Sequence, residues 1–109
     1  MLHTSLTTLS NTLEILNKAH LVEDYEHFSK NYVDRNGGWL SYQLHKDRDF
    51  CVETAIITLR NIRKVKTFYL NKRHSIGGIV DEYIEALTKA DRLIQAHIEN
   101  KYGILEIKQ

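Results

Sequence analysis

The segment between Thr54 and His74 carries six basic side chains and no acidic one, while both flanking segments carry more acidic than basic residues. The six are Arg60, Arg63, Lys64, Lys66, Lys72 and Arg73. Clustered cations on one rigid element bind phosphate or carboxylate groups. The segregation therefore predicts a basic helix that meets an anionic partner.

The candidate binding face combines cations with hydrogen-bonding side chains. Successive residues of a helix are turned by about 100°, which gathers five polar side chains within about 100° of arc. They are Arg60, Arg63, Lys64, Thr67 and Asn71. Phe68 and Tyr69 fall on the apolar side, where we expect them to pack in the core.

Three interpretations of this face are open: a solvated or internally paired surface, a site for an acidic protein, and a site for nucleic acid. The net charge of +1 and the pI of about 7.9 are low for a dedicated nucleic-acid binder, for which a pI above about 9 is typical. The charge balance therefore favours a protein partner over nucleic acid.

His20, Glu23, Asp24 and His27 have spacings that one helical face can bring together, as a zinc or iron site requires. The His-Glu-x-x-His and paired Glu-x-x-His signatures are absent. We therefore predict a solvated helix face here, no metal site and no cofactor.

Arg92 and His97 are separated by four residues, a spacing that resembles the motif of the HEPN domains, small helical ribonucleases that use it at a dimer interface. Leu93 stands where that family usually has a polar residue. The resemblance implies RNA cleavage in which imidazole moves a proton and guanidinium stabilises developing charge.

A set of acidic residues is similar to the magnesium ligands of all-helical nucleotide pyrophosphohydrolases, although the usual Glu-Glu-x-x-Glu run is missing. The set is Glu23, Glu26, Asp81, Glu82 and Glu85. A small helical ribonuclease or a metal-dependent nucleotide hydrolase is accordingly the second alternative function.

The elements that carry these residues are predicted to be helical. The 109 residues contain no proline, and the glycine pairs at 37–38 and 77–78 divide the chain into thirds. We predict one all-α domain over residues 1–109, a small antiparallel bundle of three or four helices. A short extended segment is expected near 102–107.

A leucine stripe predicts the first helix, with spacings of four and three. It consists of Leu2, Leu6, Leu9, Leu13 and Leu16. We interpret it as core, with a homodimer seam as the alternative. A bend is expected near His20, and the helical pattern resumes from Leu21 to Tyr32 until 34–38 stops it, with Asn36 or a glycine in the left-handed conformation.

Three later segments complete the prediction. Residues 39–45 are irregular or a short helix, 49–71 form a long amphipathic helix that Asp49 could cap, and Val80 to Ile98 form the last helix. Cys51, the only cysteine, is expected to be a buried packing residue in a reducing cytoplasm. No apolar run reaches the ~20 residues of a membrane span, and no secretion signal is recognised.

These patterns together predict a small cytoplasmic protein, not an enzyme, that docks its basic helix on a larger protein or ribonucleoprotein with an acidic surface. By analogy alone, an inhibitor or immunity-type factor of mobile elements fits this size and class. A homodimeric nucleic-acid-binding protein that places the basic helix on phosphates is the first alternative.

Overall fold

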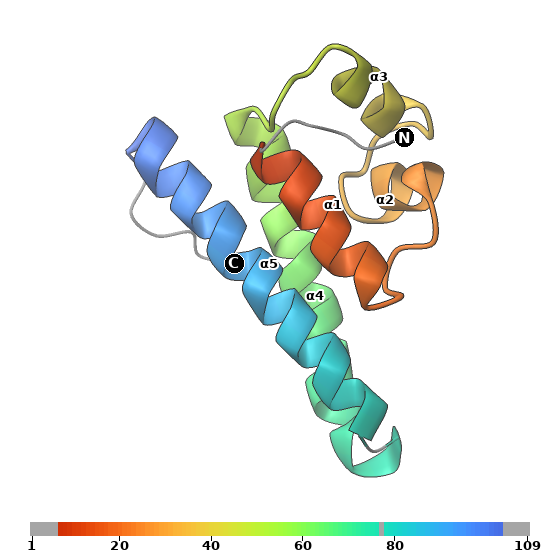
Figure 1. Cartoon of the computed structure of the whole chain (residues 1–109). Helices are drawn as coiled ribbons and strands as arrows, with labels where there is room; N and C mark the ends of the chain where they lie inside the picture. The colour runs from red at the N-terminus through yellow and green to blue at the C-terminus, as the bar shows by residue number, and fades with distance from the viewer. Residues whose placement is uncertain (1–6, 77, 104–109) are drawn as a thin grey trace.

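The computed structural model describes residues 7–76 and 78–103, and this part of the chain is all-α. Its helices are α1 (Thr8–Lys18), α2 (Tyr25–Asn31), α3 (Trp39–His45), α4 (Val52–Ile76) and α5 (Gly78–Tyr102) (Figure 1). The predicted class is confirmed. The predicted count of three or four helices is wrong for the described residues, because the segment between α1 and α4 folds into two short helices of its own.

The two long helices form an antiparallel hairpin. Contacts between them run in opposite order along the two helices: Arg63 meets Asp91, and Arg73, farther along α4, meets Asp81, nearer the start of α5. In Figure 1 the other three helices cover one end of this hairpin, and its turn projects beyond them. None of the described helices is long and apolar enough to cross a membrane.

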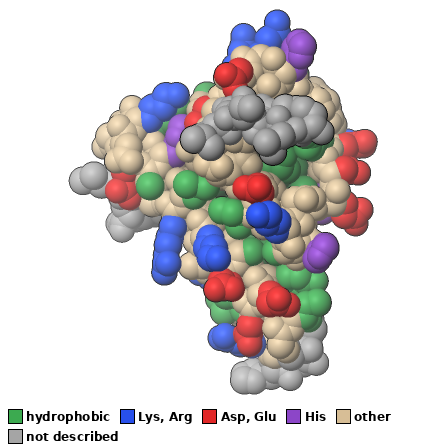
Figure 2. Space-filling view, in the orientation of Figure 1, with side chains coloured by type: hydrophobic (Ala, Val, Ile, Leu, Met, Phe, Trp, Pro, Cys, Tyr) green, Lys and Arg blue, Asp and Glu red, His purple; other side chains and the backbone are tan. Residues whose placement is uncertain are grey.

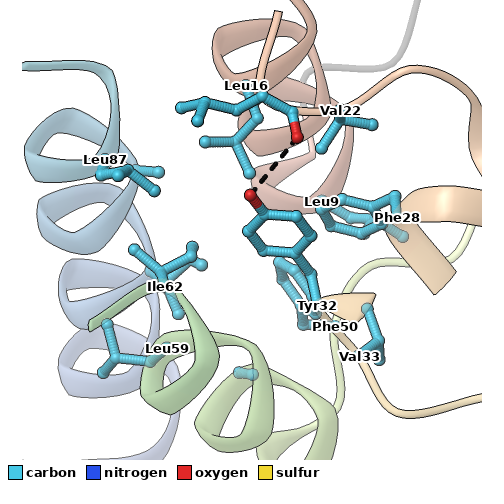
Figure 3. Packing of buried hydrophobic residues seen from close by; sticks show 14 of the residues in the cluster. Leu9, Leu16, Val22, Phe28, Tyr32, Val33, Phe50, Leu59, Ile62 and Leu87 are labelled. Carbon is cyan, nitrogen blue, oxygen red and sulfur yellow. Dashed lines mark hydrogen bonds between the residues drawn. The ribbon is translucent and has the colours of Figure 1, made fainter. Parts of the chain in front are cut away.

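The core lies where α1 and α2 meet the hairpin. Figure 3 shows the Tyr32 ring beside Leu9 and Phe28, with its hydroxyl directed at the Leu21 carbonyl, which it meets at 3.4 Å. Each large apolar side chain that is fully buried stabilises the fold by about 2 kcal/mol. The fully buried members include Leu9, Leu16, Phe28, Val33, Leu40, Phe50, Leu59, Ile62, Leu87, Ile94 and Ile98.

The leucine stripe supplies core residues, as predicted. Leu9 and Leu16 are fully buried, and Leu13 packs against the same cluster. Leu2 and Leu6 lie outside the described residues. The buried leucines of α1 are thus already covered within one chain, and the homodimer seam stays a prediction.

Local backbone geometry sets where the short helices begin and end. His20 has φ 65°, so the expected bend is a full break between α1 and α2. Asp24 caps α2, its side chain accepting from the His27 N–H. After α2 the left-handed residue is Asp34, with φ 58°, and not Asn36 or a glycine of 37–38 as expected. The short-helix alternative for 39–45 is confirmed by α3.

Asp49 does not cap α4, contrary to the prediction. Its carboxylate accepts hydrogen bonds from the backbone N–H groups of Thr8 (3.0 Å) and Leu9 (2.8 Å), in the first turn of α1. Helix α4 begins only at Val52, because Phe50 enters the core before the helix starts. An extended segment was expected near 102–107, but Tyr102 is the last residue of α5. Residues 104–107 lie outside the described residues.

Candidate functional site

The exposed face of α4 carries four of the five predicted site residues. Arg60, Lys64, Thr67 and Asn71 are all exposed, and their spacing places them within about 60° of arc. Among the described residues, none forms an ion pair with Arg60 or Lys64. Two cations and two hydrogen-bonding side chains therefore project together from one rigid helix.

Arg63 does not belong to this face, contrary to the prediction. Its guanidinium donates to the Asp91 carboxylate through Nε (2.8 Å) and Nη2 (3.3 Å), and to Gln95 Oε1 (3.2 Å). The side chains of Arg63 and Asp91 are only 24% and 21% exposed. A bidentate pair at this depth fixes α4 against α5, so Arg63 is a structural residue.

Phe68 adds an apolar side chain beside the basic face. It is 53% exposed, whereas the sequence pattern placed it in the core. It follows Lys64 by four residues and precedes Lys72 by four, and the Lys72 ammonium lies 5.7 Å from its ring centroid. Tyr69 behaves as predicted: it is half-buried and its ring lies 4.9 Å from that of Tyr83.

The α4 face, defined here as Arg60, Lys64, Thr67, Phe68, Asn71 and Lys72, is the candidate site. The spacing of four between Arg60, Lys64, Phe68 and Lys72 is the signal that could have added Phe68 and Lys72 from the sequence. Arg73 is excluded because it pairs with Asp81 at 2.8 Å, and Lys66 because it is half-buried. Figure 2, which views the molecule from the side of α1 and α5, shows acidic and basic side chains interspersed over the described surface there.

The residues considered for metal binding do not share a helix. His20 and Glu23 lie in the break between α1 and α2, and Asp24 is the N-cap of α2. His27 Nδ1 accepts a hydrogen bond from the Glu23 N–H at 3.0 Å. The described residues contain no group of three or more His, Cys, Asp or Glu side chains that could hold a metal ion.

The same finding covers the carboxylates considered for magnesium. Glu26 pairs with Lys30 on its own helix at 2.6 Å, and Asp81 pairs with Arg73. These two carboxylates thus each have a cation of the chain beside them.

Arg92 and His97 point in different directions. Five positions on a helix turn the side chain by about 140°. Arg92 is exposed, whereas the His97 side chain is 7% exposed, with Nδ1 at 3.1 Å from Thr8 Oγ1 and 3.7 Å from the Asp49 carboxylate. The structure does not bring the imidazole and the guanidinium of one chain onto a common surface.

Cys51 is exposed, and the expectation of a buried packing thiol is wrong. It lies at the start of α4 beside a hollow of about 450 Å³, lined by Trp39, Gln43, Arg48, Asp49, Phe50, Cys51, Thr54, Lys101 and Tyr102. Burial raises the pKa of the thiol, but hydrogen bonds from the Thr54 hydroxyl and from backbone N–H groups outweigh it and leave the pKa below its usual value. Within the described part of the chain, the close polar neighbour of the thiol is the Thr54 hydroxyl at 3.3 Å, and no base is hydrogen-bonded to the thiol there.

In a comparison with known families, residues 9–102 match a family of unknown function (DUF6626). No curated protein and no solved structure matches the chain.

Proposed function

We propose that this chain, which belongs to the family of unknown function DUF6626, is a small binding protein that docks the α4 face on an anionic surface of a larger protein or ribonucleoprotein. The observation that carries the proposal is the contrast within one helix. Arg63 and Arg73 are held by carboxylates of α5, whereas Arg60 and Lys64 have no ion-pair partner among the described residues.

Docking through this face uses two different contributions. Exposed cations steer an anionic partner and raise the association rate more than they raise affinity. Affinity needs buried anchor area, which is supplied by aromatic and Arg side chains at the centre of an interface. Phe68, exposed between Lys64 and Lys72, is positioned to be that anchor.

In this proposal the molecule is a small helical bundle that acts in the cytoplasm, since one cysteine in 109 residues fits a reducing compartment. Inhibition of a larger assembly, as by inhibitors and immunity factors of mobile elements, is proposed by analogy alone. A binding role, and not catalysis, is proposed because the α4 face offers exposed cations beside an exposed aromatic ring, which are groups that bind a partner surface.

The test is affinity capture with charge-reversed variants. The tagged protein and the double variant Arg60→Glu/Lys64→Glu are compared in extracts of the source cells, and retained proteins and nucleic acids are identified. Lys89→Glu/Arg92→Glu is the matched control, because both residues are exposed on α5 and the charge change is the same. Circular dichroism verifies that all variants are folded.

We expect a partner that wild type and control retain and that the α4 variant loses, with retention falling as salt rises. Equal retention by the folded Arg60→Glu/Lys64→Glu variant would remove the α4 face from the proposal.

A further inference from the structure

Helix α3 presents polar side chains to solvent from a fixed position. Leu40 is fully buried, and Leu44 packs against the core cluster, so these two side chains hold α3 on the rest of the molecule. Ser41, Tyr42 and His45 lie on the opposite side and are exposed. The helix therefore has one side that packs inward and one that carries hydroxyl and imidazole groups.

Contacts with α2 determine how α3 is oriented. The buried Ser29 hydroxyl of α2 accepts the Leu40 N–H at 3.0 Å, and the Asn36 side chain accepts the Gly38 N–H at 3.0 Å in the connecting loop. The result is a pair of packed helices joined by a loop, with the second helix outermost. Figure 1 shows α3 at one end of the molecule, opposite the turn of the α4–α5 hairpin.

Cations gather around the exposed ring of α3. Tyr42 is 50% exposed, with Lys46 Nζ at 5.8 Å and Arg48 Cζ at 5.6 Å from its ring centroid. Neither Lys46 nor Arg48 forms an ion pair with a described residue, although the exposed Asp47 offsets one charge. Figure 2 shows Lys, Arg and His side chains together at the end of the molecule that α3 forms.

We infer that α3 binds duplex DNA, with Ser41, Tyr42 and His45 directed at base edges in the major groove and Lys46 and Arg48 on phosphates. This surface is separate from the α4 face, and the inference does not rest on the proposed function. A helix that projects as the second of a packed pair is the element that enters the major groove in many DNA-binding proteins, and a groove about 12 Å wide admits it.

The chemistry of α3 favours duplex DNA over other nucleic acids. Single strands bind to platforms on which successive bases stack, and α3 offers one exposed ring. The major groove of duplex RNA is too deep and narrow for side chains to read. With only two cations placed on phosphates, the affinity for DNA of arbitrary sequence should lie at the weak end of the range for non-specific binding, with a Kd on the order of 10⁻⁴ M at physiological salt.

The experiment is fluorescence anisotropy of a labelled random-sequence DNA duplex with the full chain, purified with nuclease treatment, over a salt series. Wild type should bind at low salt. Lys46→Ala/Arg48→Ala should weaken binding at least tenfold and flatten the slope of log K against log salt by about 1.8, the value for two lost phosphate contacts. Tyr42→Ala should weaken binding several-fold.

Lys89→Ala/Arg92→Ala is the matched control, since it removes the same charges from exposed positions of α5 that belong to no proposed site, and it should leave duplex binding unchanged. The α4 variant Arg60→Ala/Lys64→Ala is measured beside it. The inference is overturned by no duplex binding at low salt, by equal binding of wild type and Lys46→Ala/Arg48→Ala, or by preference for single-stranded RNA. Loss of binding only in the α4 variant would overturn it too, and would assign nucleic acid to the α4 face instead. All substituted side chains are exposed, so the variants should have the melting temperature of wild type. Equal melting temperatures would exclude unfolding as the cause of weaker binding.

Discussion

Substitution of Asp49 should destabilise a helix that begins some forty residues before it. The first turn of any helix leaves backbone N–H groups without intrahelical acceptors. In α1 the Thr7 side chain serves one of them, that of Ser10. The Asp49 carboxylate serves those of Thr8 and Leu9, at 3.0 and 2.8 Å. Asp49→Ala therefore leaves these two partly buried donors of α1 without a partner, and it also removes the acceptor of the Phe50 N–H, which the same carboxylate meets at 2.7 Å.

The expected loss follows from these two bonds. A hydrogen bond to a charged group contributes about 1.5 kcal/mol or more, and a negative charge at a helix start adds about 0.5 kcal/mol. Asp49→Ala should thus lower the free energy of unfolding by at least about 3 kcal/mol. Asp49→Asn keeps one acceptor oxygen but loses the charge and one bond, so it should cost about half as much.

Urea denaturation followed by circular dichroism measures these differences, since a lower midpoint with an unchanged slope reports stability alone. In thermal unfolding the loss of 3 kcal/mol corresponds to a decrease in Tm of about 12 to 24 °C for a domain of this size. Glu82→Ala is the control, because Glu82 is exposed and should change stability by less than about 0.5 kcal/mol. An Asp49→Ala variant as stable as this control would refute the assignment of Asp49 as the cap of α1.

Three further predictions separate structural from surface residues. Arg63→Ala should cost about 2 kcal/mol in urea unfolding because it leaves a partly buried carboxylate unpaired, whereas Arg60→Ala should cost under about 0.5 kcal/mol; similar costs would contradict the assignment. Burial raises the pKa of Tyr32 to about 12, so the unfolded chain ionises first, and stability should fall by about 2 kcal/mol between pH 10 and pH 12. Tyr32→Phe should flatten that decline, and an unchanged profile would exclude Tyr32 as its source. Iodoacetamide should alkylate Cys51 with a midpoint pH below that of an ordinary thiol, and Thr54→Val should raise that midpoint; no difference between the two proteins would exclude the hydroxyl as the cause.

Most of the helical content could be predicted from the sequence because its signals are local. The leucine stripe of α1, the long amphipathic pattern of α4 and the break near His20 depend on the spacing and backbone preferences of neighbouring residues. The exposure of Arg60, Lys64, Thr67 and Asn71 followed from the same periodicity, because an arc without apolar residues faces away from the core.

The pairing and burial of side chains on α4 depended on which distant elements lie near them. Arg60 and Arg63 are three positions apart on one helix, yet Arg63 alone lies within reach of Asp91. Phe68 fits the edge of an apolar stripe, but its ring remains exposed in the folded chain. Periodicity specifies the direction in which a side chain leaves its helix and does not specify what lies there.

The sequence by itself therefore determined the all-α class, the long helices and the basic character of α4. Only the tertiary structure decided that Asp49 caps α1, that Arg63 braces α5, that Cys51 is exposed and that α3 is outermost at one end of the molecule. The physical reason is the range of the interactions. Helix formation and capping by neighbours act over a few residues, whereas an ion pair, a distant cap or burial depends on which segments the folded core brings together.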